Sequence, residues 1–100
     1  MIHQAHIYIK GDVIGIGFRA WTKIQTKMQG GIKGWVRNNF EKTELLGTEG
    51  GVEILIQGSE ADLDQMINIL KKGPPVARID EVDVFWQKVT TTFETFEIRK

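Results

Sequence analysis

The chain has 100 residues, of which 41% are hydrophobic, and its 13 basic and 13 acidic residues give a formal net charge of zero. This length suits one domain with a single core, and we expect residues 1–100 to form it. The charge balance argues against a general binder of nucleic acid or anionic membranes, because such proteins depend on an excess of Lys and Arg. With no cysteine, the chain has neither disulfides nor thiolate ligands for a metal.

No apolar run approaches the length of a membrane span, and the first ten residues lack the apolar core and cleavage site of a signal peptide. We therefore expect a cytoplasmic protein without membrane contact. The two histidines, His3 and His6, are three residues apart in an extended segment, so they point to opposite faces. A shared metal ion is not expected, and we expect no cofactor.

Alternation and helical spacing predict the first half of the domain. Residues 3–10 alternate apolar and polar side chains, which predicts a strand buried on one side. Its core face is formed by Ala5, Ile7 and Ile9. A glycine-rich turn follows at residues 11–19, and a helix then extends to a C-cap at Gly30 and Gly31. The apolar face of this helix is formed by Ala20, Trp21, Ile24 and Met28.

Two further strands and a second helix come next. Residues 32–39 alternate, and Asn38 falls on the core-facing side at the end of that strand, where an apolar residue is expected. Residues 51–58 form a strand whose core face is Val52, Ile54 and Ile56. Ser59 and Asp62 have the spacing of a capping box, and Gly73 with two prolines ends the helix. Its apolar stripe is Leu63, Met66, Ile67 and Leu70.

The chain ends in strand patterns. Residues 78–87 point Val82, Val84 and Trp86 inward, and residues 95–99 form a short strand with Phe96 and Ile98 inward. The order β-α-β-β-α-β with a possible last strand predicts an α+β fold of the ferredoxin-like class. This fold is an antiparallel sheet of four to five strands with both helices on one face. Its other face should be polar and open to solvent.

The turn GDVIGIGFRAW, residues 11–21, has three interpretations. Gly15, Gly17 and Ala20 match G-x-G-x-x-A with Glu41 about twenty residues further on, but that dinucleotide fingerprint needs a parallel, doubly wound sheet. The turn could also be purely structural, with Arg19 in solvent. A third possibility is an anion cradle, formed by glycine backbone, the helix N-terminus and the arginine fork. An arginine in the first turn of a helix is placed unfavourably, because the helix macrodipole favours acidic residues there. This position of Arg19 therefore favours a functional role in anion binding.

Two stretches resemble the signatures of a known family. GDVIGIGFR resembles the first acylphosphatase signature, G-x-V-Q-G-V-x-F-R, and GWVRN resembles the second, G-[FYW]-[AV]-[KR]-N. The later GPPVARIDEVDVFW is similar to the family's approach to its fourth strand. These matches keep the family's order, fall on the expected elements, and extend over nearly the whole chain.

The resemblance implies an enzyme that hydrolyses small-molecule acyl phosphates to a carboxylate and inorganic phosphate without a metal. By motif position, Arg19 binds the phosphate and Asn38 orients the attacking water. The phosphate cradle would be the backbone of Val13, Ile14, Gly15, Ile16, Gly17 and Phe18. Inorganic phosphate would be both product and inhibitor. We expect a monomer that binds no nucleic acid.

The chain departs from the family pattern at two places. Ile14 stands where the family usually has glutamine, and Asp12 adds a negative charge beside the expected cradle. Eleven residues separate Asn38 from Gly50, where the family pattern has three. This extra segment is either a lid over the site or a surface hairpin, and the hairpin is favoured because loop insertions cost little free energy.

A non-enzymatic binding module on the same fold is the alternative. Trp35 and Arg37 fall on the open face of the sheet, where an RNA recognition motif stacks bases. That motif needs aromatic residues on its third strand, but Glu53, Leu55 and Gln57 occupy those positions here. A small-ligand regulatory domain would share the fold. The combination of Arg19 with Asn38 argues against that role.

Overall fold

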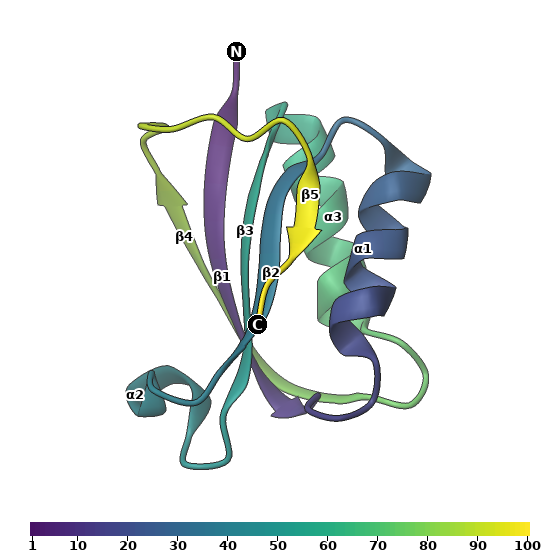
Figure 1. The fold of residues 1–100 in the computed structure, drawn as a ribbon, viewed down its shortest axis with the longest axis vertical. Helices are drawn as coiled ribbons and strands as arrows, with labels where there is room; N and C mark the ends of the chain where they lie inside the picture. The colour runs from purple at the N-terminus through teal and green to yellow at the C-terminus, as the bar shows by residue number, and fades with distance from the viewer.

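The fold is that of a two-layer α+β domain, and a computed structural model describes all 100 residues. The elements in chain order are β1 (His3–Asp12), α1 (Phe18–Gln29), β2 (Lys33–Asn39), α2 (Thr43–Leu46), β3 (Gly51–Gly58), α3 (Glu60–Lys72), β4 (Arg78–Gln87) and β5 (Phe96–Ile98) (Figure 1). Apart from the short helix α2, this is the predicted β-α-β-β-α-β order with a terminal strand. The ferredoxin-like fold class is therefore confirmed. No helix is long and apolar enough to span a membrane.

The five strands form one sheet in the order β4-β1-β3-β2-β5. β1 pairs antiparallel with β3 and β4, and β2 pairs antiparallel with β3. β5 instead pairs parallel with β2, so the prediction of an antiparallel sheet is wrong for the last strand. The reason is the connection: residues 88–95 pass across the sheet before β5 begins, and the chain enters beside the start of β2 (Figure 1). This parallel pairing brings the end of the chain beside the end of β2.

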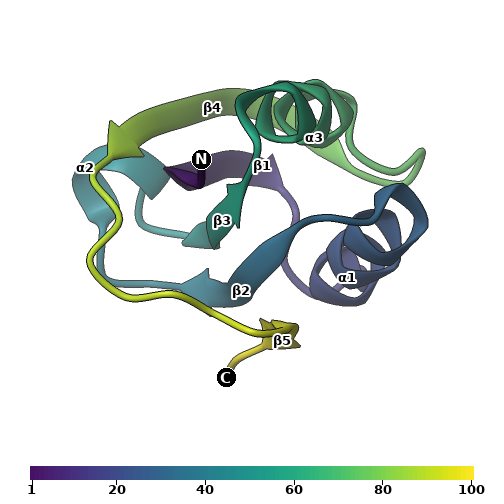
Figure 2. The same cartoon turned by 90° about the horizontal axis from the view of Figure 1, so that it is seen from above.

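The core lies between the sheet and helices α1 and α3, which cover the same face (Figure 2). The predicted inward residues of β1 and β3 are completely buried. The predicted stripe of α3 is buried as well, from Leu63 to Leu70. The Ser59 hydroxyl accepts a hydrogen bond from the Asp62 amide at 3.2 Å, so it caps α3 at the predicted position.

The predicted core face of α1 is confirmed for Trp21, which packs partly against the core, and is wrong for its other three residues. Ile24 is 55% exposed and Met28 is 76% exposed, and Ala20 is exposed too. The buried residues of this helix are Phe18, Thr22 and Thr26. Both threonine hydroxyls donate to carbonyls of their own helix, at 2.9 and 2.8 Å, so burying them leaves no unpaired donor. Phe18 is fixed in the core at the start of the helix and thereby sets which face turns inward.

The two edge strands are less buried than predicted. Val82 and Val84 are partly buried against the core, but Trp86 is half-exposed because β4 has no neighbour on its outer side. In β5, Phe96 is buried as predicted, whereas Ile98 is exposed at the opposite edge of the sheet. The inward orientation of Ile98 therefore does not place it in the core.

The second face of the sheet is polar but not open to solvent, which corrects the prediction. The segment between β4 and β5 crosses this second face of the sheet, and α2 lies on the same side (Figure 2). Gln57 donates from Nε2 to the Thr91 carbonyl at 2.6 Å and accepts from the Phe93 amide at 3.1 Å. Trp35 is 7% exposed, and the guanidinium groups of Arg37 and Arg99 lie over its ring, 5.3 and 4.9 Å from the ring centroid. Trp35 is therefore not a free aromatic platform, and the exposed aromatic ring on this face is that of Phe85 beside Tyr8.

Glu53 is the centre of a buried polar network on this second face, with only 3% of its surface exposed. Its Oε1 accepts hydrogen bonds from Arg37 Nε at 2.7 Å and from Asn39 Nδ2 at 2.8 Å. Its Oε2 lies 2.6 Å from His6 Nε2 and accepts from the Tyr8 hydroxyl at 3.4 Å. Burial alone would raise the pKa of Glu53, but the hydrogen bonds from Asn39, Arg37 and His6 and the charge of Arg37 lower it below the ordinary value.

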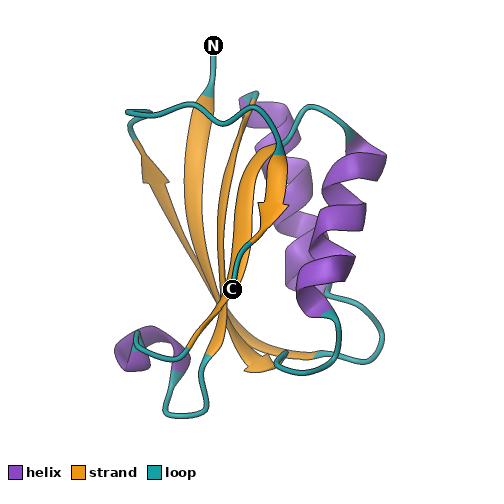
Figure 3. Ribbon diagram, viewed as in Figure 1, coloured by secondary structure: helices purple, strands orange, loops and turns teal.

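The extra segment after Asn38 forms α2 on the second face of the sheet. Asn39 Oδ1 accepts from the backbone amides of Glu41 and Lys42 at 2.8 and 3.0 Å, and this turn leads into the helix. Leu46 is 2% exposed and packs beside β3, so this segment contributes a buried apolar side chain. Figure 3 shows α2 at the side of the sheet away from α1 and α3.

Candidate active site

The turn between β1 and α1 has two glycines in the left-handed region. Gly15 has φ 78° and Gly17 has φ 79°, values that side chains other than glycine rarely adopt. A Cβ atom built at either position would meet no atom within 4 Å. These glycines are therefore required by the backbone rather than by close packing, and the space in front of them is open.

Apolar side chains hold this turn at both ends. Val13 and Phe18 are buried in the core, and Ile14 and Ile16 pack partly against it. The glycines between them are exposed. The turn thus has apolar anchors on the protein side and bare backbone on the solvent side.

The N-terminus of α1 is free of competing acceptors. Gly17 is the N-cap and has no side chain to accept from the first-turn amides, and the first turn contains no acidic residue. The initial N–H groups of a helix have no intrahelical partner, and together with the macrodipole they favour an anion. The helix start therefore has the electrostatics of an anion site.

A cavity of about 280 Å³ opens at this helix start. It is lined by Val13, Gly15, Gly17, Phe18, Arg19, Ala20, Asn38, Ile98 and Lys100. It brings together Arg19 from α1 and Asn38 from β2, as well as four of the six residues predicted for the cradle. Ile14 and Ile16 do not line it. No acidic side chain lines the cavity, whereas two cationic ones do.

The end of the chain completes the wall of this cavity. Arg19 Nη1 donates to the carbonyl of Arg99 at 3.2 Å, and the Arg99 amide donates to the carbonyl of Val36 at 2.8 Å. These contacts hold the guanidinium group beside β2. Ile98 and Lys100, which line the cavity, were not predicted as site residues. No local motif marks them, and only the parallel pairing of β5 with β2 brings them there.

Neither unusual residue of the turn lies in this cavity. Asp12 and Ile14 line a neighbouring one, of about 290 Å³, together with Gly11, Glu49 and Arg78. Asp12 is therefore directed toward the Arg78 side of the turn rather than toward Arg19. None of the residues 40–49 lines the Arg19 cavity either. The extra segment thus contributes nothing to the wall of the site, as the surface-hairpin interpretation expects.

The chain offers no preformed metal centre. No group of three His, Cys, Asp or Glu side chains is arranged to hold a metal ion. His6 faces Glu53 on the second side of the sheet, and neither residue lines the Arg19 cavity. The polar groups of the site are therefore the backbone of the turn and the side chains of Arg19, Asn38 and Lys100.

These features define a ferredoxin-like domain with an anion pocket at the start of its first helix. The acylphosphatase family profile matches residues 5–98. An acylphosphatase from Pyrobaculum islandicum is 36% identical over 95 residues, which cover 95% of this chain and 92% of that protein. One from Paraburkholderia xenovorans is 36% identical over 96 residues, with 96% and 90% covered. The crystal structure of acylphosphatase from Bacillus subtilis has a TM-score of 0.84 at 27% identity, with both chains covered completely. The chain belongs to the acylphosphatase family.

Proposed function

We propose that this protein hydrolyses acyl phosphates to a carboxylate and inorganic phosphate, with Arg19 and the turn binding the phosphate and Asn38 orienting the attacking water. The observation that carries the proposal is one cavity lined by both Arg19 and Asn38 at an uncapped helix start, in a member of the acylphosphatase family.

Phosphate binding would use groups that are already arranged around the cavity. The backbone of the turn, exposed at Gly15 and Gly17, and the first-turn amides of α1 supply donors without side chains. Arg19 supplies a planar fork of donors that suits two phosphate oxygens, and Lys100 adds a second positive charge. Because no Asp or Glu lines the cavity, no acidic side chain neutralises these cationic groups.

In the chemical step, the amide of Asn38 would hold a water molecule against the bound phosphoryl group. The water oxygen forms a bond to phosphorus, the bond from phosphorus to the acyl oxygen breaks, and the carboxylate leaves with that electron pair. The water proton passes to an oxygen of the substrate's own phosphate. Positioning and charge stabilisation carry such a reaction. A carboxylate is a good leaving group, so no strong general acid is required.

The direct test is hydrolysis of acetyl phosphate by the purified protein, with and without EDTA. We expect release of inorganic phosphate at the same rate in both, because the lining offers no metal ligands beyond one amide. A phosphate monoester should react poorly, since its alkoxide is a worse leaving group. Activity that disappears with EDTA and returns with a divalent ion would contradict the metal-free mechanism.

We also propose that the protein acts as a cytoplasmic monomer on small molecules and binds no nucleic acid. The polar face of the sheet supports this last point, since Trp35 is buried and Arg37 is engaged by Glu53. Gel filtration tests the monomeric state, and a titration with single-stranded RNA tests the absence of nucleic-acid binding. A stable dimer or tight RNA binding at physiological salt would contradict them.

A further inference from the structure

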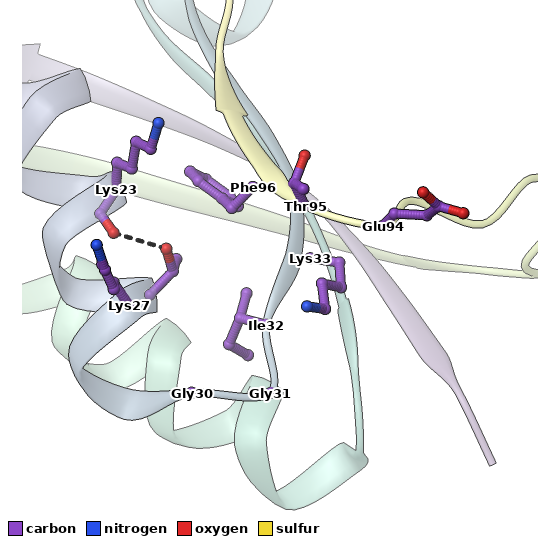
Figure 4. Close-up of a pocket in the computed structure, with 10 residues that line it drawn as sticks. Lys23, Lys27, Gly30, Gly31, Ile32, Lys33, Glu94, Thr95 and Phe96 are labelled. Atoms are coloured by element: carbon purple, nitrogen blue, oxygen red, sulfur yellow. Dashed lines mark hydrogen bonds between the residues drawn. The ribbon is translucent and has the colours of Figure 1, made fainter.

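A second and larger cavity, of about 430 Å³, lies between α1 and β5 (Figure 4). Its lining consists of Lys23, Thr26, Lys27, Gly30, Gly31, Ile32, Lys33, Glu94, Thr95 and Phe96. None of these residues lines the Arg19 cavity. The second cavity is therefore separate from the residues assigned to phosphate binding and to the attacking water.

The rim of the second cavity is strongly basic for a protein without net charge. Lys23 and Lys27 come from α1 and Lys33 comes from β2, whereas Glu94 is the one acidic residue. The four ion pairs of the molecule lie elsewhere, so none of these lysines has a carboxylate within 4.0 Å. Unpaired positive charges lining a concave surface raise the local concentration of anions.

The helix dipole does not cancel this attraction. The cavity lies toward the C-terminus of α1, where the dipole contributes about half a negative charge. Lys27, in the last turn, already offsets that charge. With Lys23 and Lys33 included, the positive charge at the rim exceeds the combined contribution of Glu94 and the helix end.

The floor of the cavity is apolar. Ile32 and Phe96 are both buried and line the space between the lysines, as Figure 4 shows. A free inorganic anion would gain nothing from this surface. An organic anion with an apolar chain would bury the chain on the floor while its charged end meets the lysines.

The second cavity lies further along α1 and β5 than the first, and both are lined by residues of these two elements. Arg19, Lys23 and Lys27 follow each other at intervals of four residues, so they share one side of α1. Each interval advances about 6 Å along the helix. On β5, Phe96 lines the second cavity and Ile98 the first, two residues apart on one face of the strand. Lys23 and Lys27 thus lie about 6–12 Å along the helix from the arginine that would hold the phosphate.

We propose that the second cavity, called the α1–β5 groove from here on, binds the acyl part of the substrate. The preferred substrates are then acyl phosphates with an apolar chain that ends in a carboxylate. The inference rests on the proposed function. The terminal carboxylate meets Lys23, Lys27 and Lys33 while Arg19 holds the phosphoryl group. The chain between them lies on Phe96 and its neighbours.

Three acyl phosphates test the proposal by comparison of kcat/KM: the monophosphate of octanedioic acid, octanoyl phosphate and acetyl phosphate. The parent should prefer the octanedioic compound to octanoyl phosphate, which has the same chain without the carboxylate. The triple variant Lys23→Gln, Lys27→Gln, Lys33→Gln should lose about tenfold in kcat/KM for that compound, since each exposed ion pair contributes modestly. Its kcat/KM for octanoyl phosphate and acetyl phosphate, which lack the terminal carboxylate, should stay within about twofold of the parent value.

A matched variant controls for the change in net charge. Lys71, Lys72 and Lys88 are exposed and lie outside both cavities, so changing all three to Gln removes the same charge without touching the groove. This variant should keep the parental preference. An unchanged preference in the groove variant, or an equal loss on all three substrates, would overturn the inference while the proposed function stands. Failure of the parent to hydrolyse acetyl phosphate would overturn the proposed function and, with it, this inference.

Discussion

Replacing Glu53 by Gln perturbs the network on the polar face of the sheet with almost no change in shape. In the parent, each carboxylate oxygen has two neighbours: Arg37 and Asn39 at Oε1, and His6 and Tyr8 at Oε2. A glutamine has one acceptor oxygen and presents N–H groups on the other side. The substitution also removes the negative charge that faces Arg37.

The expected cost follows from these contacts. Removing one partner of a buried charge pair costs about 3–5 kcal/mol. The Arg37 side chain is 42% exposed and can be rehydrated, which lowers the cost. We therefore expect the free energy of unfolding to fall by about 2–3 kcal/mol. For a domain of this size, that loss corresponds to a decrease in Tm of about 10–20 °C.

The loss in free energy of unfolding caused by Glu53→Gln should become smaller at low pH. The pKa of Glu53 is lower in the folded state than its ordinary 4.5. The contribution of the carboxylate is therefore fully present above about pH 5 and is lost as the pH falls through the folded pKa. The difference between parent and Glu53→Gln should shrink accordingly as the pH falls from 7 toward about 3.

Urea unfolding followed by circular dichroism at several pH values measures this difference. Glu81→Gln serves as a control on an exposed carboxylate of β4 and should change the free energy of unfolding by less than about 0.5 kcal/mol. A difference between parent and Glu53→Gln that stays constant over the whole pH range would mean that the charge of Glu53 contributes nothing to stability.

Three other predictions concern the extra segment and the anion site. Leu46→Ala should lower the free energy of unfolding by about 2–4 kcal/mol, because the side chain is buried, and should leave KM unchanged; a large rise in KM without loss of stability would instead favour a lid. Gly17→Ala should cost about 1–2 kcal/mol in stability and weaken phosphate binding, because φ is 79°; parental stability would mean that the turn tolerates another conformation. Inorganic phosphate at about 100 times its Kd should stabilise the parent by about 2.7 kcal/mol but not Arg19→Ala, with the exposed Arg78→Ala as control. Equal stabilisation of Arg19→Ala would place the anion elsewhere.

The sequence predicts those parts of the fold that depend on local periodicity. The core stripe of α3 is correct because its apolar residues have no competing face. The core face of α1 is wrong except at Trp21 because Thr22 and Thr26 count as polar by residue type but bond within their own helix. The burial of Glu53 could not be predicted, because its partners come from two other strands and part of the cover on that face comes from residues 88–95, far along the chain.

In the candidate site, too, the residues marked by a local motif were predicted, and those brought in by distant pairing were not. Arg19 and Asn38 follow from motifs whose spacing survives in the sequence, and they line one cavity. Ile98 and Lys100 depend on a parallel pairing of only three residues at the edge of the sheet. Such a short strand carries no signal that selects its neighbour or direction, so this wall of the site was missed.

Arg19 and Asn38 have separate roles in the proposed mechanism, and the variant Asn38→Ala distinguishes them. If Asn38 contacts only the attacking water, the variant should bind inorganic phosphate with a Kd within about twofold of the parent value, measured by calorimetry. Its kcat for acetyl phosphate should fall about 100-fold or more, the scale for losing one preorganised polar group. An Asn38→Ala variant that turns over acetyl phosphate at the parental rate would contradict the account.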